Sequence, residues 1–292
     1  MVTAQWFRLG GGVVHPLTRR YKSKVNMDHL LEDNNISVTH DTVLPSGHLV
    51  KAGSKVTTIS SQGEYNGYKM RVPPPEFEAL MFFNALEAAF KAEQMKKDIL
   101  IQRSGFDGMF EIDTSEENMQ KFFAMCQQAM AAITFSISAI ESWVNKSFVL
   151  HGKVDGKPTQ LRLERPNKTA REIFSDKIAT DQSIPIRPKL FQLAPQVFDV
   201  PPLKEHSSLR KAVSELVDER NILMHMQSSL TISSLEFDRV SYAVKLYKVS
   251  AFHGPEQILK YFNYIYEKSA LPTPLWLSVA SGELKSCRKK LK

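Results

Sequence analysis

The side chains best suited to chemistry in this chain lie in one stretch, ELVDERNILMH, at residues 215–225. Arg220 supplies a guanidinium that stays charged and can form two parallel hydrogen bonds with phosphate oxygens. His225 supplies an imidazole, the side chain whose ordinary pKa lies nearest to neutrality, so it can take up or release a proton. Asn221 can hydrogen-bond a phosphate oxygen or hold the imidazole in one orientation. Together these side chains can carry positive charge, form hydrogen bonds and transfer a proton.

These three residues fall near the end of a predicted amphipathic helix. At about 100° per residue, one side of the helix is an apolar stripe formed by Leu209, Val213, Leu216 and Leu223. Arg220 lies inside this stripe, where a guanidinium is costly unless a carboxylate, a phosphate or a partner chain receives it. Asn221 and His225 share another face, and His225 stands roughly 140° from Arg220. One helix can aim both heads at one atom only if Arg220 bends around it or a second copy supplies one of them.

An Arg, a polar residue after it and a His five positions on, late in an apolar helix, make a pattern that resembles the HEPN family. Members of that family are all-α domains, and the catalytic ones cut RNA without a metal. The matching positions are Arg220, Asn221 and His225. The family also carries an acidic residue on an earlier helix, and the run SAIESWVN at 138–145 resembles that helix, with Glu141 as its acid. The resemblance covers about residues 114–268 and does not reach the N-terminal third.

The resemblance implies a metal-independent endoribonuclease without a cofactor, working as a homodimer whose two motif helices face each other across a composite cleft. RNA would supply its own nucleophile: the ribose 2′-OH attacks the adjacent phosphorus, which leaves a 2′,3′-cyclic phosphate and a 5′-OH end. His225 would act as base or acid, and Arg220 would stabilise the charge growing on the non-bridging oxygens. Asn221 would contact the phosphate or fix the imidazole, and Glu141 would orient the cations.

The same resemblance implies a biological setting in the cytoplasm, in antiphage defence or toxin–antitoxin growth arrest. The substrate would be tRNA or mRNA. An antitoxin or a phage-derived trigger would be the further partner, and the N-terminal part would sense, inhibit or select.

Three other interpretations of these residues stay open. His225 can be a cation at a helix C-terminus, favoured by the helix dipole, with Arg220 as a structural ion-pair partner. The bundle can also be a non-catalytic module for RNA binding or dimerisation. A metal hydrolase built on His40, Asp41 and His48 is the third, although these potential ligands are spread across predicted turns.

Bulk composition points to a globular protein with a polyanionic partner. The 292 residues, 42% of them hydrophobic, give room for one large or two small domains. The net charge is +7, and residues 113–292 hold 25 basic and 19 acidic side chains. Cys126 and Cys287 form no C-x-x-C pattern, which favours a reducing cytoplasm. The apolar runs fall short of the ~20 residues that a membrane helix needs, and the N-terminus lacks a signal-peptide core, so no membrane contact is expected.

The elements predict an α+β protein: a mainly α-helical, HEPN-like up-and-down bundle at 113–292 and a smaller β-containing N-terminal domain. Residues 1–27 are expected to be a flexible leader, and residues 28–112 an α+β domain of unknown role. The elements predicted within that domain are short strands at 36–72, a helix at 76–97 and strands at 99–104 and 108–113. The core positions predicted for its helix are Phe77, Leu80, Phe83, Leu86, Ala89 and Phe90.

A long helix is predicted at 114–147, because a capping-box pattern at 114–117 opens it and neither Gly nor Pro interrupts it. Its polar seam consists of Thr134, Ser138, Glu141 and Asn145, which face either solvent or the Arg220 helix. A hairpin insertion at 148–163, around Asp155-Gly156, follows.

Basic side chains on and after this hairpin form either an RNA-binding rim or ordinary solvated charge: Lys153, Lys157, Arg162, Arg165, Lys168 and Arg171. The remaining predictions are a helix at 169–180, an extended proline-rich loop at 184–202, a cap at Ser207 or Ser208, helices at 239–247 and 255–268, and a mobile basic tail at 284–292. The aromatic cluster of the last helix is expected to stack on bases or to seal a core or a dimer face: Tyr261, Phe262, Tyr264 and Tyr266.

Overall fold

A computed structural model of the chain describes residues 35–37, 41–43, 49–53, 55–57, 61–65, 68–72, 76–103, 110–165, 168–181, 183–225 and 242–292. Contacts divide the chain into two compact units: Met1–Ile36 with Val56–Pro74, and Ser37–Lys55 with Pro75–Lys292. The predicted leader at 1–27 lies outside the described residues.

The segment between 36 and 72 forms short paired strands, as predicted. Its elements are β1 (Asn35–Ser37), β2 (Thr42–Val43), β3 (Leu49–Val50), β4 (Lys55–Thr57), β5 (Ser61–Tyr65) and β6 (Tyr68–Val72). β1 pairs with β4, and β2–β3 and β5–β6 are antiparallel pairs. Tyr65 pairs with Tyr68, so two residues connect β5 to β6.

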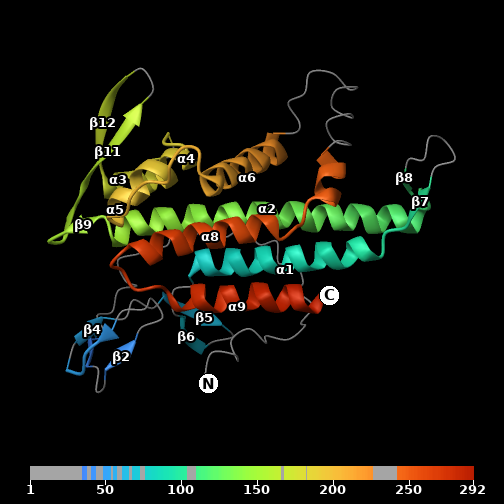
Figure 1. Cartoon of the computed structure of the whole chain (residues 1–292). Coiled ribbons are helices and arrows are strands. Elements are labelled where there is room, and N and C mark those ends of the chain that lie inside the picture. The colour runs from blue at the N-terminus through green and yellow to red at the C-terminus, as the bar shows by residue number, and fades with distance from the viewer. Residues whose placement is uncertain are drawn as a thin grey trace. The chain divides into compact units, whose positions relative to one another are not determined.

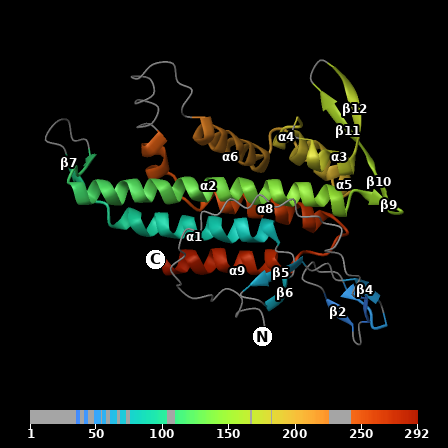
Figure 2. The same cartoon turned by 180° about the vertical axis from the view of Figure 1, so that it is seen from behind.

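Helices make up most of the unit that contains Pro75–Lys292. The longer ones are α1 (Phe77–Lys97), α2 (Glu116–Leu150), α6 (Ser208–His225), α8 (His253–Lys268) and α9 (Leu275–Lys290). α1, α6 and α8 each lie along α2, and α9 lies along α1 (Figures 1 and 2). The α+β class is therefore confirmed in its coarse form, mostly helical with small antiparallel strand pairs.

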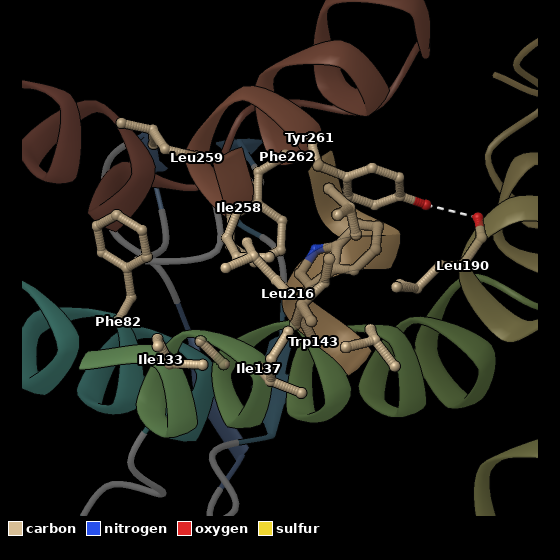
Figure 3. Packing of buried hydrophobic residues seen from close by; sticks show 14 of the residues in the cluster. Phe82, Ile133, Ile137, Trp143, Leu190, Leu216, Ile258, Leu259, Tyr261 and Phe262 are labelled. Atoms are coloured by element: carbon tan, nitrogen blue, oxygen red, sulfur yellow. Dashed lines mark hydrogen bonds between the residues drawn. The ribbon is translucent and has the colours of Figure 1, made fainter. Parts of the chain in front are cut away.

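The core lies where α2 meets α6 and α8. Ile133 and Ile137 of α2 point toward Leu216 of α6 and Ile258 of α8 (Figure 3). Farther along α2, Trp143 packs among the rings of Phe198, Tyr261, Phe262 and Tyr266. These aromatic residues of α8 are thus core residues, apart from the more accessible Tyr264.

By length and composition alone, α2 is apolar enough to cross a membrane, with a mean hydropathy of 1.4 over 18 residues. Scattered polar residues interrupt the apolar run of α2 without lowering the average below that limit. Half of this segment is buried inside the protein, as expected for the central helix of a packed unit.

α1 packs along α2 with a face that confirms the predicted core positions Leu86 and Ala89 but not Phe77 and Leu80. Phe77 and Leu80 are 56% and 39% exposed, whereas Ala85 and Ala89 are completely buried beside Phe82. Alanines allow the two backbones to approach closely, and this outweighs the larger apolar area of the phenylalanines. α1 and α2 pack together in the unit that holds Ser37–Lys55 and Pro75–Lys292, and the domain boundary at residue 112 stays a prediction.

The predicted strands between α1 and α2 are present as β7 (Ile101–Arg103) and β8 (Phe110–Ile112), an antiparallel pair. The capping box is not formed. Ser115 donates to the carboxylate of Asp113, and no side chain caps α2. Instead, the side chain of the buried Asn118 accepts a hydrogen bond from the N–H of Leu100 and donates hydrogen bonds to the carbonyls of Leu100 and Asp113. These bonds tie the hairpin to the first turn of α2.

Residues 148–180 hold two hairpins, not one. α2 continues to Leu150, and the hairpin of β9 (Lys153–Val154) and β10 (Lys157–Pro158) turns at Asp155-Gly156, both with positive φ. β11 (Gln160–Arg165) then pairs with β12 (Lys168–Phe174), and only α3 (Ser175–Thr180) is helical. The predicted helix at 169–180 is wrong in its first half, because Ile173 pairs with Leu161 across the sheet and both are buried.

The proline-rich segment 184–202 is helical where an extended loop was expected. It forms α4 (Ile186–Pro188), a π-helical turn (Lys189–Leu193) and α5 (Ala194–Val197). The Pro195 ring would crowd the carbonyl of Phe191 in a regular α-helix. The wider π turn, in which the N–H of Ala194 donates to the carbonyl of Lys189, accommodates the proline, and Leu190 and Leu193 become completely buried.

The predicted helix at 255–268 is confirmed by α8. Residues 242–247 of the predicted 239–247 helix are helical, and the helix continues to Lys248. The prediction of a mobile tail at 284–292 is wrong. α9 extends to Lys290 because Leu284 is buried and the Arg288 guanidinium pairs with Glu256 of α8 at 2.5 Å.

Replacing Tyr261 by Phe is expected to lower the free energy of unfolding by about 1–2 kcal/mol, because the buried carbonyl of Leu190 loses a donor at 2.6 Å. The matched control is Tyr264→Phe, which removes a bond to the Pro201 carbonyl at 2.7 Å in an accessible position where water can replace it. Urea unfolding measures both. Equal losses in the two variants would contradict the buried bond.

Candidate functional site

α6 holds the predicted motif in a fixed orientation. Its N-terminus is capped by Ser207, whose Oγ accepts a hydrogen bond from the N–H of Arg210 at 3.3 Å. Val213 and Leu216 are buried, on a helix that packs against α2 and α8. Arg220 follows Leu216 by about one turn on the same stripe. Packing of the two apolar residues therefore determines that the guanidinium emerges beside α2.

Glu141 of α2 receives this guanidinium. Arg220 Nη2 lies 3.2 Å and 3.4 Å from the two carboxylate oxygens of Glu141, and Arg220 Nη1 donates to Asn221 Oδ1 at 3.3 Å. The Arg220 and Glu141 side chains are 31% and 30% exposed. The structure thus brings Glu141, Arg220 and Asn221 together at a partly open position between the two helices.

His225 is the last helical residue of α6. Its side chain lies outside the part of the chain that the structure describes, so its distance from Arg220 is not part of the observed geometry. Its backbone position follows Asn221 by four residues, which places the two on neighbouring positions of one face.

Lys189 is a neighbour of this group that the sequence analysis missed. It is only 7% exposed, and its Nζ donates to Asn145 Oδ1 at 3.1 Å. Burial lowers the pKa of the Lys189 ammonium, while the carboxylates of Asp181 and Glu141 act in the opposite direction. Asn145 and Glu141, two members of the predicted polar seam, therefore meet polar partners of this chain. The signal was hidden because 184–202 was interpreted as a loop.

Arg187 anchors the next face of α6. Its Nη2 pairs with the Asp218 carboxylate and donates to the carbonyl of Ser214 at 2.9 Å. Its Nε is buried and has no hydrogen-bond partner. Asp218 is thus engaged in holding α6 against the segment before the π turn.

Opposite charges balance in this region, which combines three cations with three carboxylates: Arg187, Lys189, Arg220, Asp181, Glu141 and Asp218. The contacts of Arg220 use no more than three of its five N–H donors. A phosphate oxygen can therefore bind the guanidinium while Glu141 still holds it. A phosphate placed there is repelled by the carboxylate of Glu141, so phosphate binding depends on additional cations.

The predicted RNA-binding residues lie on the hairpins after α2. Lys153 and Lys157 are exposed on β9 and β10, and Arg162 on β11 pairs with Glu164 at 2.7 Å. Arg165 is half-buried and pairs with Lys168 in the strand register. Glu141 stands nine residues before the end of α2, about 14 Å along the helix axis. Lys153 and Lys157 therefore lie beyond the end of α2, whereas β11, which carries Arg162 and Arg165, packs against the π turn.

Among the described residues, no group of three His, Cys, Asp or Glu side chains is arranged to hold a metal ion. His40 and His48 of the alternative metal site lie outside the described residues. Asp41 accepts a hydrogen bond from the N–H of Ala52 at 2.8 Å, which connects the two ends of the β2–β3 hairpin. Cys126 and Cys287 are free thiols.

The lowered pKa of Lys189 predicts a stability change at alkaline pH. Between the native pKa and the unfolded value of about 10.4, the unfolded chain binds more protons, so this lysine contributes increasing stability as pH rises. Urea unfolding at several pH values should show the parent gaining stability relative to Lys189→Met over that range. Lys211→Met, at a side chain that is 77% exposed, is the control and should show no such trend. A constant difference between the parent and Lys189→Met would contradict the prediction.

Comparison of the chain with known proteins found no relative: no family model, no curated protein and no solved structure matches it. The interpretation of the site therefore depends on its residues and their contacts.

Proposed function

We propose that the chain is a metal-independent endoribonuclease of the HEPN type, with Arg220, Asn221, His225 and Glu141 as its site. The observation that carries the proposal is the Arg220–Glu141 contact at 3.2 Å. The two residues were selected from separate stretches of sequence, 79 positions apart, because each matched a different part of the family pattern. Ordinary packing does not require an arginine in the apolar stripe to meet that particular acid.

In the proposed reaction, neutral His225 accepts the proton of a ribose 2′-OH as its oxygen forms a bond to the adjacent phosphorus. The bond from phosphorus to the 5′-oxygen breaks, and that oxygen takes up a proton from an imidazolium. The products are a 2′,3′-cyclic phosphate and a 5′-OH. Arg220 stabilises the additional charge on the non-bridging oxygens during this step.

Glu141 is a positioning residue in this proposal. A carboxylate that receives Nη2 leaves other guanidinium donors for the phosphate and limits the rotamers of a long side chain. Asn221 holds Nη1 from the other side. Arg220 is then pre-oriented before RNA binds, which is the condition for electrostatic stabilisation without reorganisation.

A homodimer belongs to the proposal, because Arg220 and His225 stand roughly 140° apart on α6. A second copy that places its α6 opposite the first brings one protomer's imidazole toward the other's guanidinium. The surplus of basic residues in 113–292 and the exposed Lys153 and Lys157 supply attraction for the RNA backbone. We place this activity in the cytoplasm, in antiphage defence or toxin–antitoxin growth arrest, with tRNA or mRNA as substrate and an antitoxin or a phage-derived trigger as regulator.

One observation favours a second function, a non-catalytic module for RNA binding or dimerisation. Arg187, Lys189 and Arg220 each have a polar partner within the chain, an arrangement that also suits a purely structural role. This function predicts RNA binding that weakens with salt and yields no cleavage products.

The test is incubation of the purified protein with labelled total RNA, with and without a chelator. His225→Ala and Arg220→Lys should each lower the cleavage rate by about 100-fold or more while the chelator has no effect, because they remove the proton carrier and the forked donor. Arg210→Lys is the matched control on the same helix, where the guanidinium contacts the Leu203 carbonyl, and should leave the rate within a few-fold of the parent.

Urea unfolding of each variant separates loss of chemistry from loss of structure. Cleavage by His225→Ala at the parental rate would remove that residue from the mechanism. RNA binding without products in the parent would support the binding module, and loss of cleavage in chelator would point to a metal.

A further inference from the structure

A cavity of about 270 Å³ lies where four helix ends converge. These are the start of α1, the end of α2, the end of α8 and the start of α9, which come together at one end of the helices in Figure 1. The lining residues that matter here are Glu76, Glu78, Trp143, Lys146, Tyr266 and Trp276.

This cavity is separate from the Arg220 group. Lys146 follows Glu141 by five residues on α2, so the two side chains leave the helix roughly 140° apart. The residues that line the cavity include neither Glu141 nor any residue of α6. A ligand in the cavity is therefore distinct from the RNA of the proposed reaction.

Two carboxylates of the cavity share one lysine. Lys146 Nζ pairs with the carboxylate of Glu78, whose side chain is 5% exposed, and lies 3.9 Å from an oxygen of Glu76. One ammonium thus serves two carboxylates, and Glu76, with 27% of its side chain exposed, has the weaker contact. Both acids stand at the N-terminus of α1. Among these three side chains the two carboxylates outnumber the one ammonium, and His151 is a further titratable side chain of the lining.

The walls beside these carboxylates are aromatic and rigid. The indole Nε1–H of Trp143 donates to the Tyr266 hydroxyl at 3.1 Å, and both side chains are buried. A hydroxyl that accepts this bond can still donate its own hydrogen. Trp276 packs edge to face on Phe262, with ring centroids 5.4 Å apart, so its ring is held from behind. Aromatic rings next to a carboxylate attract organic cations through both the ring quadrupole and the charge.

We propose that this cavity binds a small organic cation, a primary amine whose ammonium group approaches Glu76 and whose flat apolar body lies against the aromatic walls. An anion would meet two carboxylates, and a neutral ligand would leave the excess charge unmatched. A hard metal ion prefers six or more oxygen ligands, which the two acids beside Lys146 do not supply. The volume lies at the lower limit of small-molecule sites, so the ligand has about one ring.

The pKa of Glu76 is raised above its ordinary value, mainly by burial and also by Glu78, while Lys146 acts in the opposite direction. His151 also lines the cavity and can contribute to the pH dependence of binding. A cationic ligand favours the ionised carboxylate, so amine binding is expected to weaken as the pH falls through the pKa of Glu76. This dependence adds a second measurable property to the site.

The experiment titrates the full chain, by calorimetry and thermal shift, with benzylamine, phenethylamine and tryptamine as probes, and with benzyl alcohol and benzoate as neutral and anionic counterparts. At least one amine should bind saturably, and its counterparts should bind about tenfold or more weakly, because they lack the bond to the carboxylate. Glu76→Gln, at a partly exposed position, should weaken amine binding by a similar factor.

Glu87→Gln is the control, at an exposed acid of α1 that pairs with Lys91 at 2.7 Å, and should leave the affinity unchanged. Failure of all three amines to bind would overturn the proposal. Equal binding of benzylamine and benzyl alcohol, or equal affinity in the parent and Glu76→Gln, would also overturn it. None of these outcomes depends on whether the chain cleaves RNA.

Discussion

The packing of α2 against α1, α6 and α8 is the constraint that positions every group discussed above. This helix has 35 residues, about 52 Å of length, and contributes buried side chains along nearly all of it. α1 meets it through alanines, and α6 and α8 meet it through branched and aromatic side chains. Only the seam of Glu141 and Asn145 remains polar where α6 and the π turn approach, so charged side chains from both segments gather there.

Magnitudes indicate what holds Arg220 in place. Full burial of a valine or leucine contributes about 1.5–3 kcal/mol, whereas a partly exposed ion pair contributes about 0–1 kcal/mol. Val213 and Leu216 therefore determine where α6 lies, and the contact with Glu141 follows from that placement. An arginine held by weak electrostatics in a position set by strong packing remains able to exchange or share its partner. This property suits a residue that receives a phosphate, and it is equally compatible with a structural pair.

The sequence predicted elements whose signal is local. The long apolar periodicity of α2, the Asp155-Gly156 turn and the cap at Ser207 all depend on neighbouring residues. The predictions were wrong where contacts between distant parts of the chain determine the secondary structure. Lys168–Phe174 is a strand because Ile173 meets Leu161, and 186–197 is helical because burying Leu190 and Leu193 outweighs the prolines. Within the candidate site, the wheel position of Arg220 indicated a buried partner, and Glu141 was named from the family pattern. Lys189 could not be found, since no local pattern links it to Asn145, 44 positions away.

Two consecutive residues of α2 have contacts on different sides of the helix. Asn145 accepts the bond from Lys189, while Lys146 neutralises Glu78 at the cavity. Their side chains diverge by about 100°. If this part of α2 rotated about the helix axis, both side chains would move. Asn145 would shift relative to Lys189, and Lys146 would shift relative to Glu78. The helix end is thus a mechanical connection between two surfaces that share no side chain.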